Sequence, residues 1–182
     1  RRWSRAFGLV LQRASLKIAK RWLQAGIAAH LLEGSDVSHI HAHFAHNPAT
    51  VAMIMSILLD LPFSFTAHAK DIFHKDNHND MLVLKINRAR LVVTVSDFNR
   101  RYLITLNPAA AAKVHVVRNG LPLANFPMRP CDPGGRRILA VGRLEEKKGF
   151  PTLVEGCAIL AANGIQFDCH IVGAGPERTR IE

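Results

Sequence analysis

The sequence contains no hydrophobic run that could form a membrane-spanning helix. Such a helix needs about 18 or more consecutive apolar residues, whereas the best candidate stretch, residues 49–69, is interrupted by Asp60 and Pro62. Low-complexity tracts and internal repeats are also absent. Because 48% of the residues are hydrophobic, the composition excludes a disordered chain and predicts a packed globular core.

Cysteine is scarce, and its positions argue against a metal site. The three cysteines, Cys131, Cys157 and Cys169, are odd in number and lack metal-ligand spacing. Two of them fall inside a predicted helix and a predicted strand, so we expect buried, reduced thiols in a cytosolic protein. The chain also begins at Arg1 without a signal-peptide pattern, from which we expect an internal fragment of a longer protein.

Acidic residues are few: 14 Asp and Glu stand against 24 Lys and Arg, a formal net charge of +10 with His neutral. The excess is concentrated in residues 1–33, where seven Lys and Arg are accompanied by one acidic residue, Glu33. A basic surface of this kind can bind nucleic acid, an anionic membrane or an acidic substrate. Nucleic acid is disfavoured because the chain has neither a basic strand studded with aromatic residues nor a recognition-helix pattern. A non-catalytic basic α/β module that binds nucleic acid or anionic membrane remains the alternative function.

Residues 1–33 have the periodicity of a helix. Apolar residues recur at three- and four-residue steps along one face, and most of the basic residues fall opposite. The apolar face comprises Trp3, Phe7, Val10, Leu11, Ala14, Ile18 and Trp22. A second apolar line, Leu9, Leu16 and Leu23, favours a helix packed on a sheet. Two interpretations stay open: a domain helix with a solvated basic face, or a helix that contacts an anionic membrane surface.

From residue 36 onward, apolar runs typical of strands alternate with helical patterns, which predicts parallel βαβ units in a doubly wound α/β fold. Predicted strands lie near residues 38–44, 62–67, 91–95, 114–117, 137–142 and 166–172. Predicted helices lie near residues 48–60, 79–89, 97–106 and 149–162. A segment rich in Pro and Gly, residues 120–135, breaks both patterns, so we place a domain boundary near residue 130.

The segment from residue 136 to residue 149 carries the strongest functional pattern. An apolar strand ends at Gly142 and Arg143, and Lys148 precedes a helix that has Pro151 in its first turn. A strand end, two cations and the free N–H groups of a helix start can converge on one point, which suits a phosphate or diphosphate. A second strand ends in a turn with Gly173 and Gly175, and glycine there would let the backbone approach a ligand.

These motifs, with Asn119 and Gly120 upstream, resemble those of the family 4 retaining glycosyltransferases of the GT-B fold, especially the bacterial polysaccharide type. The resemblance implies two Rossmann-like domains, both incomplete here. Residues 1–130 would form an acceptor-side domain without its first strand and glycine-rich loop. Residues 131–182 would begin a nucleotide-sugar domain without its downstream pair of glutamates. We therefore expect the chain alone to be inactive and poorly soluble, with residues 138–141 and 169–172 partly uncovered.

The resemblance also implies the chemistry. The intact protein would move a sugar from a nucleotide-sugar donor to a carbohydrate or lipid-linked acceptor, with retention, in polysaccharide or glycolipid biosynthesis. Arg143 and Lys148 would hold the donor's diphosphate, no metal or other cofactor would be needed, and Gly142, Gly173 and Gly175 would complete the donor site. The expected location is the cytoplasm, peripherally on the inner face of the membrane through residues 1–33.

Histidine is frequent in the first two thirds of the chain. His68 directly follows a predicted strand and so projects from the ligand edge of the sheet; by resemblance it would hydrogen-bond the transferred sugar or a nearby phosphate. Asp71 could bond His68 or cap the next segment. His43 is a candidate for lining the cleft because it lies nearest the carboxyl end of its strand, whereas His41 is expected to be packed.

Other patterns have simpler explanations. His39, His41 and His43 alternate along one strand and share a face, but no cysteine or carboxylate stands at ligand spacing beside them. A Ser-His-Asp hydrolase is disfavoured because no Gly-x-Ser-x-Gly turn is present, and Ser96 is expected to be a helix N-cap. Asn119 is a second candidate for the cleft, although Asn119-Gly120 is most simply a turn.

Overall fold

The structure, a computed structural model, describes residues 16–73, 79–127 and 135–182. The chain divides into two compact units, residues 1–121 and residues 122–182, which are described separately. The domain boundary expected near residue 130, and with it Cys131, lies outside the described residues.

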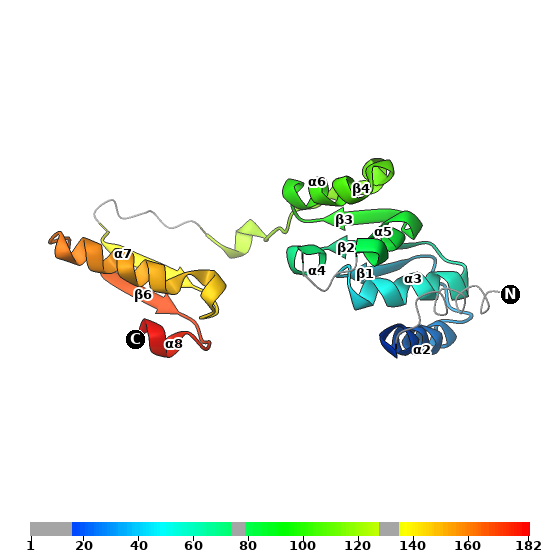
Figure 1. Ribbon diagram of the computed structural model, residues 1–182, viewed down its shortest axis with the longest axis horizontal. Helices are drawn as coiled ribbons and strands as arrows, with labels where there is room; N and C mark the ends of the chain where they lie inside the picture. Colours follow the sequence, from blue (N-terminus) through cyan, green and yellow to red (C-terminus); the bar gives the residue numbers. More distant parts are fainter. Residues whose placement is uncertain (1–15, 74–78, 128–134) are drawn as a thin grey trace. The chain divides into compact units, whose positions relative to one another are not determined.

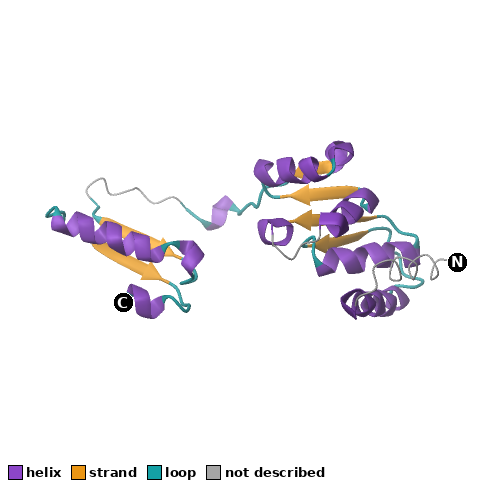
Figure 2. Cartoon of the chain, viewed as in Figure 1, coloured by secondary structure: helices purple, strands orange, loops and turns teal. Residues whose placement is uncertain are grey.

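The first unit contains a four-stranded parallel sheet in the order β1-β2-β3-β4 (Figure 1). Its strands are β1 (Ile40–His43), β2 (Phe63–Ala67), β3 (Leu91–Thr94) and β4 (Val114–Val116). Its helices are α2 (Leu16–Leu31), α3 (Asn47–Leu59), α4 (Ala69–Phe73), α5 (Asn79–Arg88), α6 (Asp97–Leu106) and the 3-10 helix η1 (Pro108–Lys113). Helices separate the successive parallel strands (Figure 2), so the predicted α/β fold with a parallel sheet is confirmed.

One face of this sheet forms the hydrophobic core. Phe65 and Val92 are partners in the β2–β3 register and are fully buried. Helices α3, α5 and α6 supply the side chains that pack with them, including Met53, Ile86 and Leu103. Burial of apolar strand residues beneath helices is what stabilises a parallel sheet.

The opposite face carries several polar side chains and is only partly open in the part of the chain that is described, since Ser64 and Thr66 of β2 are buried. His41, His43 and His115 are exposed there, and Leu91 is 36% exposed. Parallel sheets are ordinarily covered on both faces. Within the described ranges only one face is covered by helices.

Helix α2 packs mainly against α3, in a cluster that also includes Ile40 of β1. Ala25 and Ala29 of α2 are buried against Ile54 and Leu58 of α3, because small residues let two helices approach closely. The basic residues Lys17 and Lys20 are exposed, as expected, but they share their side of the helix with apolar residues. The side opposite the alanines carries exposed apolar residues beside Lys17 and Lys20; these are Leu16, Leu23, Ile27 and Leu31.

The second unit is built on two parallel strands. Its elements are η2 (Leu123–Asn125), β5 (Arg137–Val141), η3 (Glu146–Lys148), α7 (Phe150–Ala162), β6 (Asp168–Val172) and α8 (Arg178–Ile181). Strands β5 and β6 pair in register from Arg137 with Asp168 to Val141 with Val172. Leu139 is 69% exposed and Val172 is 54% exposed, so the prediction that these strands are partly uncovered is confirmed.

The two described cysteines differ from the expectation of buried thiols. Cys157 on α7 and Cys169 on β6 are half-buried and free. Partial desolvation and a hydrogen bond with the Cys169 thiol raise the pKa of Cys157. With one helix against the strands, the unit has too little covering structure to enclose them fully.

Candidate functional site

The carboxyl ends of β1 and β2 bring three aromatic side chains together. The His43 and His68 rings stack with centroids 6.0 Å apart and an interplanar angle of 25°. The Phe44 ring lies 4.9 Å from His68. Because β1 pairs with β2 and His43 is opposite Thr66, both loops leave the sheet at the same edge. Two of the predicted residues therefore meet, and Phe44 joins them.

Phe44 has an unusual backbone conformation. Its φ is 75°, in the left-handed region that a bulky side chain rarely adopts. Its N–H donates to the carbonyl of Thr66 at 2.8 Å, and its side chain is 49% exposed. Phe44 was not among the residues predicted from the sequence. The available signal was a large aromatic residue directly after a strand, on the edge where ligands of such sheets bind.

Asp71 connects the two strand-end loops. It is 1% exposed, and its Oδ1 accepts the backbone N–H of His68 at 2.8 Å while its Oδ2 accepts the N–H of Ala45 at 2.5 Å. His68 immediately precedes α4 and Asp71 is the third residue of that helix, so the first bond is the returning half of a capping box. Both roles considered for Asp71 are found, because its bond to the backbone N–H of His68 also caps α4.

A second buried charge lies beside Asp71. Lys85 of α5 is 5% exposed, and its Nζ donates to the carbonyl of Ala45 and, at 3.4 Å, to the carbonyl of His46. Desolvation lowers the pKa of Lys85 to about 8, and the Asp71 carboxylate opposes this shift. Lys85 was not predicted as a site residue because, in the sequence, this lysine looks like an ordinary charged residue of an amphipathic helix.

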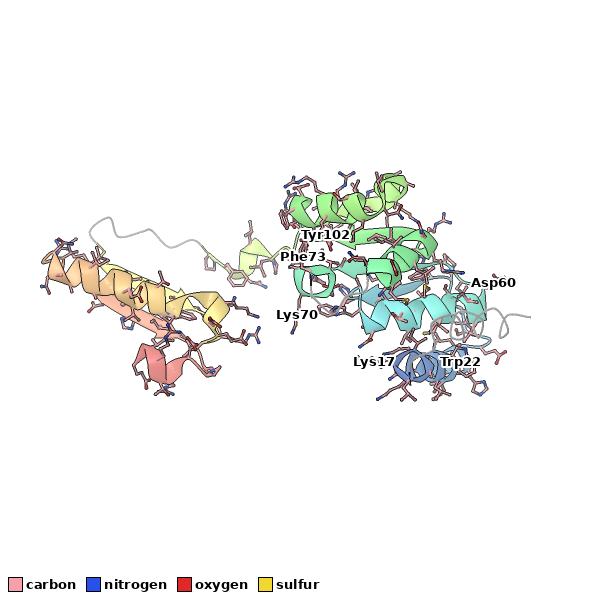
Figure 3. The ribbon with its side chains drawn as sticks, in the orientation of Figure 1. Lys17, Trp22, Asp60, Lys70, Phe73 and Tyr102 are labelled. Atoms are coloured by element: carbon pink, nitrogen blue, oxygen red, sulfur yellow. The ribbon has the colours of Figure 1, made fainter. Side chains whose placement is uncertain are left out.

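The far end of α4 is held by aromatic contacts with α6. The Phe73 ring lies 4.6 Å from that of Tyr102 and 5.6 Å from that of Phe98. Figure 3 shows Phe73 and Tyr102 together at this end of the unit. The short helix that begins after His68 is thus held at both ends.

The other histidine of β1, His41, was expected to be packed but is exposed, and it is bonded to the neighbouring strand. His41 hydrogen-bonds through Nδ1 to Ser64 at 2.6 Å and through Nε2 to Thr66 at 2.9 Å. Partial desolvation is the main cause that lowers the pKa of His41, and electrostatic interaction with the neighbouring His43 and His39 lowers it further. In the residues that the structure describes, no three His, Cys, Asp or Glu side chains are grouped so as to hold a metal ion.

Two further predicted residues lie apart from the His68 cluster. Ser96 is the N-cap of α6 and accepts the N–H of Asn99 at 3.2 Å, which confirms that prediction. Asn119 is exposed in an irregular segment beyond β4, and β4 is separated from β2 by β3.

In the second unit, the turns after β5 and β6 pack backbone to backbone. The N–H of Gly142 donates to Val172 at 3.0 Å, and that of Leu144 donates to Ala174 at 2.9 Å. A Cβ added to Gly173 would lie 1.8 Å from the Gly142 carbonyl oxygen, and one added to Gly175 would lie 2.3 Å from the Leu144 carbonyl oxygen. Contact between the two turns therefore requires these glycines, whether or not a ligand approaches them.

Arg143 lies before η3, and Lys148 ends it. Arg143 follows β5, and Lys148 is the last residue of η3 before Gly149 and α7. Gly149 has a φ of 69°, a left-handed conformation that glycine adopts at little cost. No side chain caps the start of α7. Exposed cations beside an uncapped helix start suit an anion.

Glu145, which was not among the residues predicted from the sequence, already contacts Arg143 and the neighbouring Lys147. Glu145 pairs with Arg143 Nη1 at 2.6 Å and with Lys147 Nζ at 3.1 Å. The hydrogen bond from Lys147 and the charges of Arg143 and Lys148 lower the pKa of Glu145, so it is ionised at neutral pH. An anionic ligand at this turn would compete with Glu145 for Arg143.

Comparison with known proteins gives the family. Residues 2–125 match the model of Glycosyltransferase Family 4. The chain is 31% identical over 96 residues to the putative colanic acid biosynthesis glycosyltransferase WcaL of Salmonella typhimurium, a match that covers 52% of this chain and 23% of that protein. It is 34% identical over 94 residues to the amylovoran biosynthesis glycosyltransferase AmsK of Erwinia amylovora, covering 50% of this chain and 23% of that protein. The chain thus matches about a quarter of the length of these relatives. It belongs to Glycosyltransferase Family 4.

Proposed function

We propose that the intact protein transfers a sugar from a nucleotide-sugar donor to a carbohydrate or lipid-linked acceptor in the biosynthesis of a polysaccharide or glycolipid. The anomeric configuration is retained, and no metal or other cofactor takes part. Membership of Glycosyltransferase Family 4 and the similarity to WcaL and AmsK support this proposal.

The observation that carries the mechanism is the cation cluster beside the start of α7. As the bond between the anomeric carbon and the diphosphate oxygen breaks, negative charge develops on the departing nucleoside diphosphate. Arg143 and Lys148 neutralise that charge, and fixed charges aimed at a developing anion lower the barrier most effectively where water is scarce. Arg143 exchanges its partner Glu145 for the diphosphate, with which a guanidinium forms charge-assisted, bidentate hydrogen bonds.

The His68 cluster contributes to the sugar end of the reaction. His68 hydrogen-bonds the transferred sugar or an adjacent phosphate and is not a nucleophile. His43 and Phe44, whose rings lie close to His68, form the surface next to it.

The activity is tested by incubating the intact protein with a panel of nucleotide sugars and a carbohydrate or lipid-linked acceptor. Release of nucleoside diphosphate that depends on the acceptor is expected, and NMR of the new glycosidic linkage should show the configuration of the donor. Absence of turnover, together with nucleic-acid binding that collapses steeply as salt rises, would instead support a non-catalytic basic module.

We further propose that the exposed side of α2 rests on an anionic membrane. Among the described residues, no helix has the length and apolar character needed to cross a membrane. The exposed side of α2 combines Leu16, Leu23 and Ile27 with Lys17 and Lys20, the combination found in helices that lie in the membrane interface. Figure 3 shows Lys17 and Trp22 on this helix.

Liposome sedimentation of the intact protein tests this surface. The double substitution Lys17→Gln and Lys20→Gln should weaken binding to anionic vesicles by roughly 1 kcal/mol per cation, because each basic residue near such a surface contributes about that much. Lys113→Gln, which removes a cation elsewhere in the unit, is the control. Equal binding to neutral and anionic vesicles would rule out the charge-dependent docking.

A further inference from the structure

We infer that Asp71 and Lys85 are positioning residues, which hold the loops after β1 and β2 so that Phe44 and His68 present their rings side by side. The catalytic consequence rests on the proposed sugar transfer. The contacts that carry the inference do not depend on it.

The two charged side chains hold the backbone of one residue, Ala45, through its N–H and its carbonyl, which belong to consecutive peptide units. The N–H of Ala45 donates to Asp71, and the carbonyl of Ala45 accepts from Lys85. Ala45 itself is 1% exposed. Asp71 belongs to α4 and Lys85 to α5, so two separate elements fix the loop that follows β1.

The same carboxylate fixes the loop that follows β2. Asp71 accepts the backbone N–H of His68 at 2.8 Å through its other oxygen. One side chain therefore bonds the residue after Phe44 and also the backbone of His68. This shared anchor sets the distance between the two rings, which is 4.9 Å.

The backbone of Phe44 explains why a strong anchor is needed. A bulky residue at a φ of 75° is strained, and such strain persists only where the surrounding structure over-determines it. The bond from Phe44 N–H to Thr66 fixes one side of the residue. The Asp71 and Lys85 bonds to Ala45 fix the other side.

Folding stability alone does not account for this pair. Desolvation of Lys85 lowers its pKa to about 8, which means that burial disfavours its charged form. Buried ion pairs can often be replaced by apolar residues with no loss of stability. What the pair does determine is the geometry of the two loops, at the strand ends where ligands of parallel sheets bind.

The test compares Asp71→Asn and Lys85→Met with Asp97→Asn in the intact protein. Asp97 is the control because it forms an exposed ion pair with Arg118 at the same end of the sheet and contacts neither loop anchor. We measure amide hydrogen exchange at Ala45, His68 and the core residue Val92, the imidazole NMR shifts of His68, and kcat and KM for the donor.

The first two variants should lose amide protection at Ala45 and His68 by about 10-fold or more while Val92 is unchanged, since local opening is separable from global unfolding. The His68 shifts should move as the Phe44 ring is displaced. The value of kcat should fall by about 10-fold or more with little change in KM, because misplacement by about 1 Å can cost up to roughly 100-fold. Asp97→Asn should change none of these.

The inference is overturned if protection falls equally at all three amides, or if the His68 shifts and kcat stay at wild-type values. If a single variant fails to fold, Asp71→Asn/Lys85→Met, which removes both charges, replaces it, and the same outcomes apply. If the wild-type protein transfers no sugar, the proposed function fails, while amide exchange and the His68 shifts still decide the positioning role.

Discussion

The two strand-end sites of this chain are built in different ways. After β1 and β2, buried side chains of opposite charge hold the loops, with Asp71 1% exposed and Lys85 5% exposed. After β5 and β6, the turns hold each other through backbone contacts that require glycine, and the charged side chain of Arg143 is 68% exposed. At the first site the charged side chains bond the loops themselves. At the second site the cations are exposed, where an anionic ligand could reach them.

This difference indicates where each site is sensitive to change. Loss of a buried charge leaves its partner in a poorly solvated environment and moves the loops that it held. Loss of an exposed cation leaves the fold intact and removes only what it contributes to a ligand. We therefore expect the fold to be unchanged when the cations of the second site are replaced. Loss of a buried charge at the first site should instead disturb the structure of its loops.

The largest expected effect is on catalysis at the second site. Arg143→Ala or Lys148→Ala in the intact protein should each lower kcat/KM by about 100-fold or more, roughly 3 kcal/mol, as expected for loss of one fixed transition-state charge. The melting temperature should barely change because both side chains are exposed. Arg137→Ala, at the other end of β5, is the matched control. Near-normal rates in both variants would remove these residues from the mechanism.

The second prediction concerns the pH dependence of the first site. The folded-state pKa of Lys85 is about 8, against 10.5 for the exposed group. Between these values the unfolded chain binds more protons, so the free energy of unfolding should rise with pH. The stabilising contribution is complete above pH 10.5 and is lost as the pH falls through 8.

The comparison with Lys85→Met isolates this effect. The difference in unfolding free energy between wild type and variant should change by up to roughly 3 kcal/mol across that window, measured by chemical denaturation at a series of pH values. Other lysines titrate in both proteins and cancel. Parallel stability curves would show that Lys85 is not desolvated in solution.

The third prediction tests the backbone contact at the second site. Gly173→Ala places a methyl group against the Gly142 carbonyl oxygen, and forcing this contact apart should cost about 2 kcal/mol or more. Gly156→Ala is the control, because its Cβ would have nothing within 4 Å in the middle of α7 and should be neutral or stabilising by up to about 1 kcal/mol. Urea denaturation measures both. Equal stability of the two variants would mean that the turns are not in contact in solution.

The sequence predicted the elements that carry strong local patterns. The runs that became β2, β3 and β5 are short, apolar and rich in β-branched or aromatic residues, and α6 was preceded by the capping residue Ser96. The short helices α4 and η1 were not predicted, since one or two turns are too few to show a period. On α2, the predicted apolar line that includes Trp22 is packed, but the second line, Leu16 and Leu23, is exposed, because a helix with two apolar lines does not reveal that only one of them is packed.

The anchors of the first site were beyond prediction for a different reason. Lys85 and its acceptor Ala45 are 40 residues apart, and they meet because α5 packs against α3, whose N-cap, His46, directly follows Ala45. No local pattern distinguishes a buried lysine of this kind from a solvated one. At the second site, by contrast, Arg143 and Lys148 are close together in the chain and were selected from the sequence, whereas their neighbour Glu145 was not.

The smallest expected effect concerns Glu145, which contacts Arg143 and Lys147. Glu145→Gln frees both cations, so a nucleoside diphosphate would no longer compete with an internal anion. Exposed ion pairs contribute only about 0.2–1 kcal/mol, so calorimetry should show binding that is roughly two- to five-fold tighter, with the gain shrinking at high salt. Glu155→Gln removes the same charge from the exposed side of α7 and should have little effect. Weaker binding in Glu145→Gln would reverse the interpretation: Glu145 would then hold Arg143 in the orientation that the ligand needs, and the second site would depend on an internal anchor just as the first does.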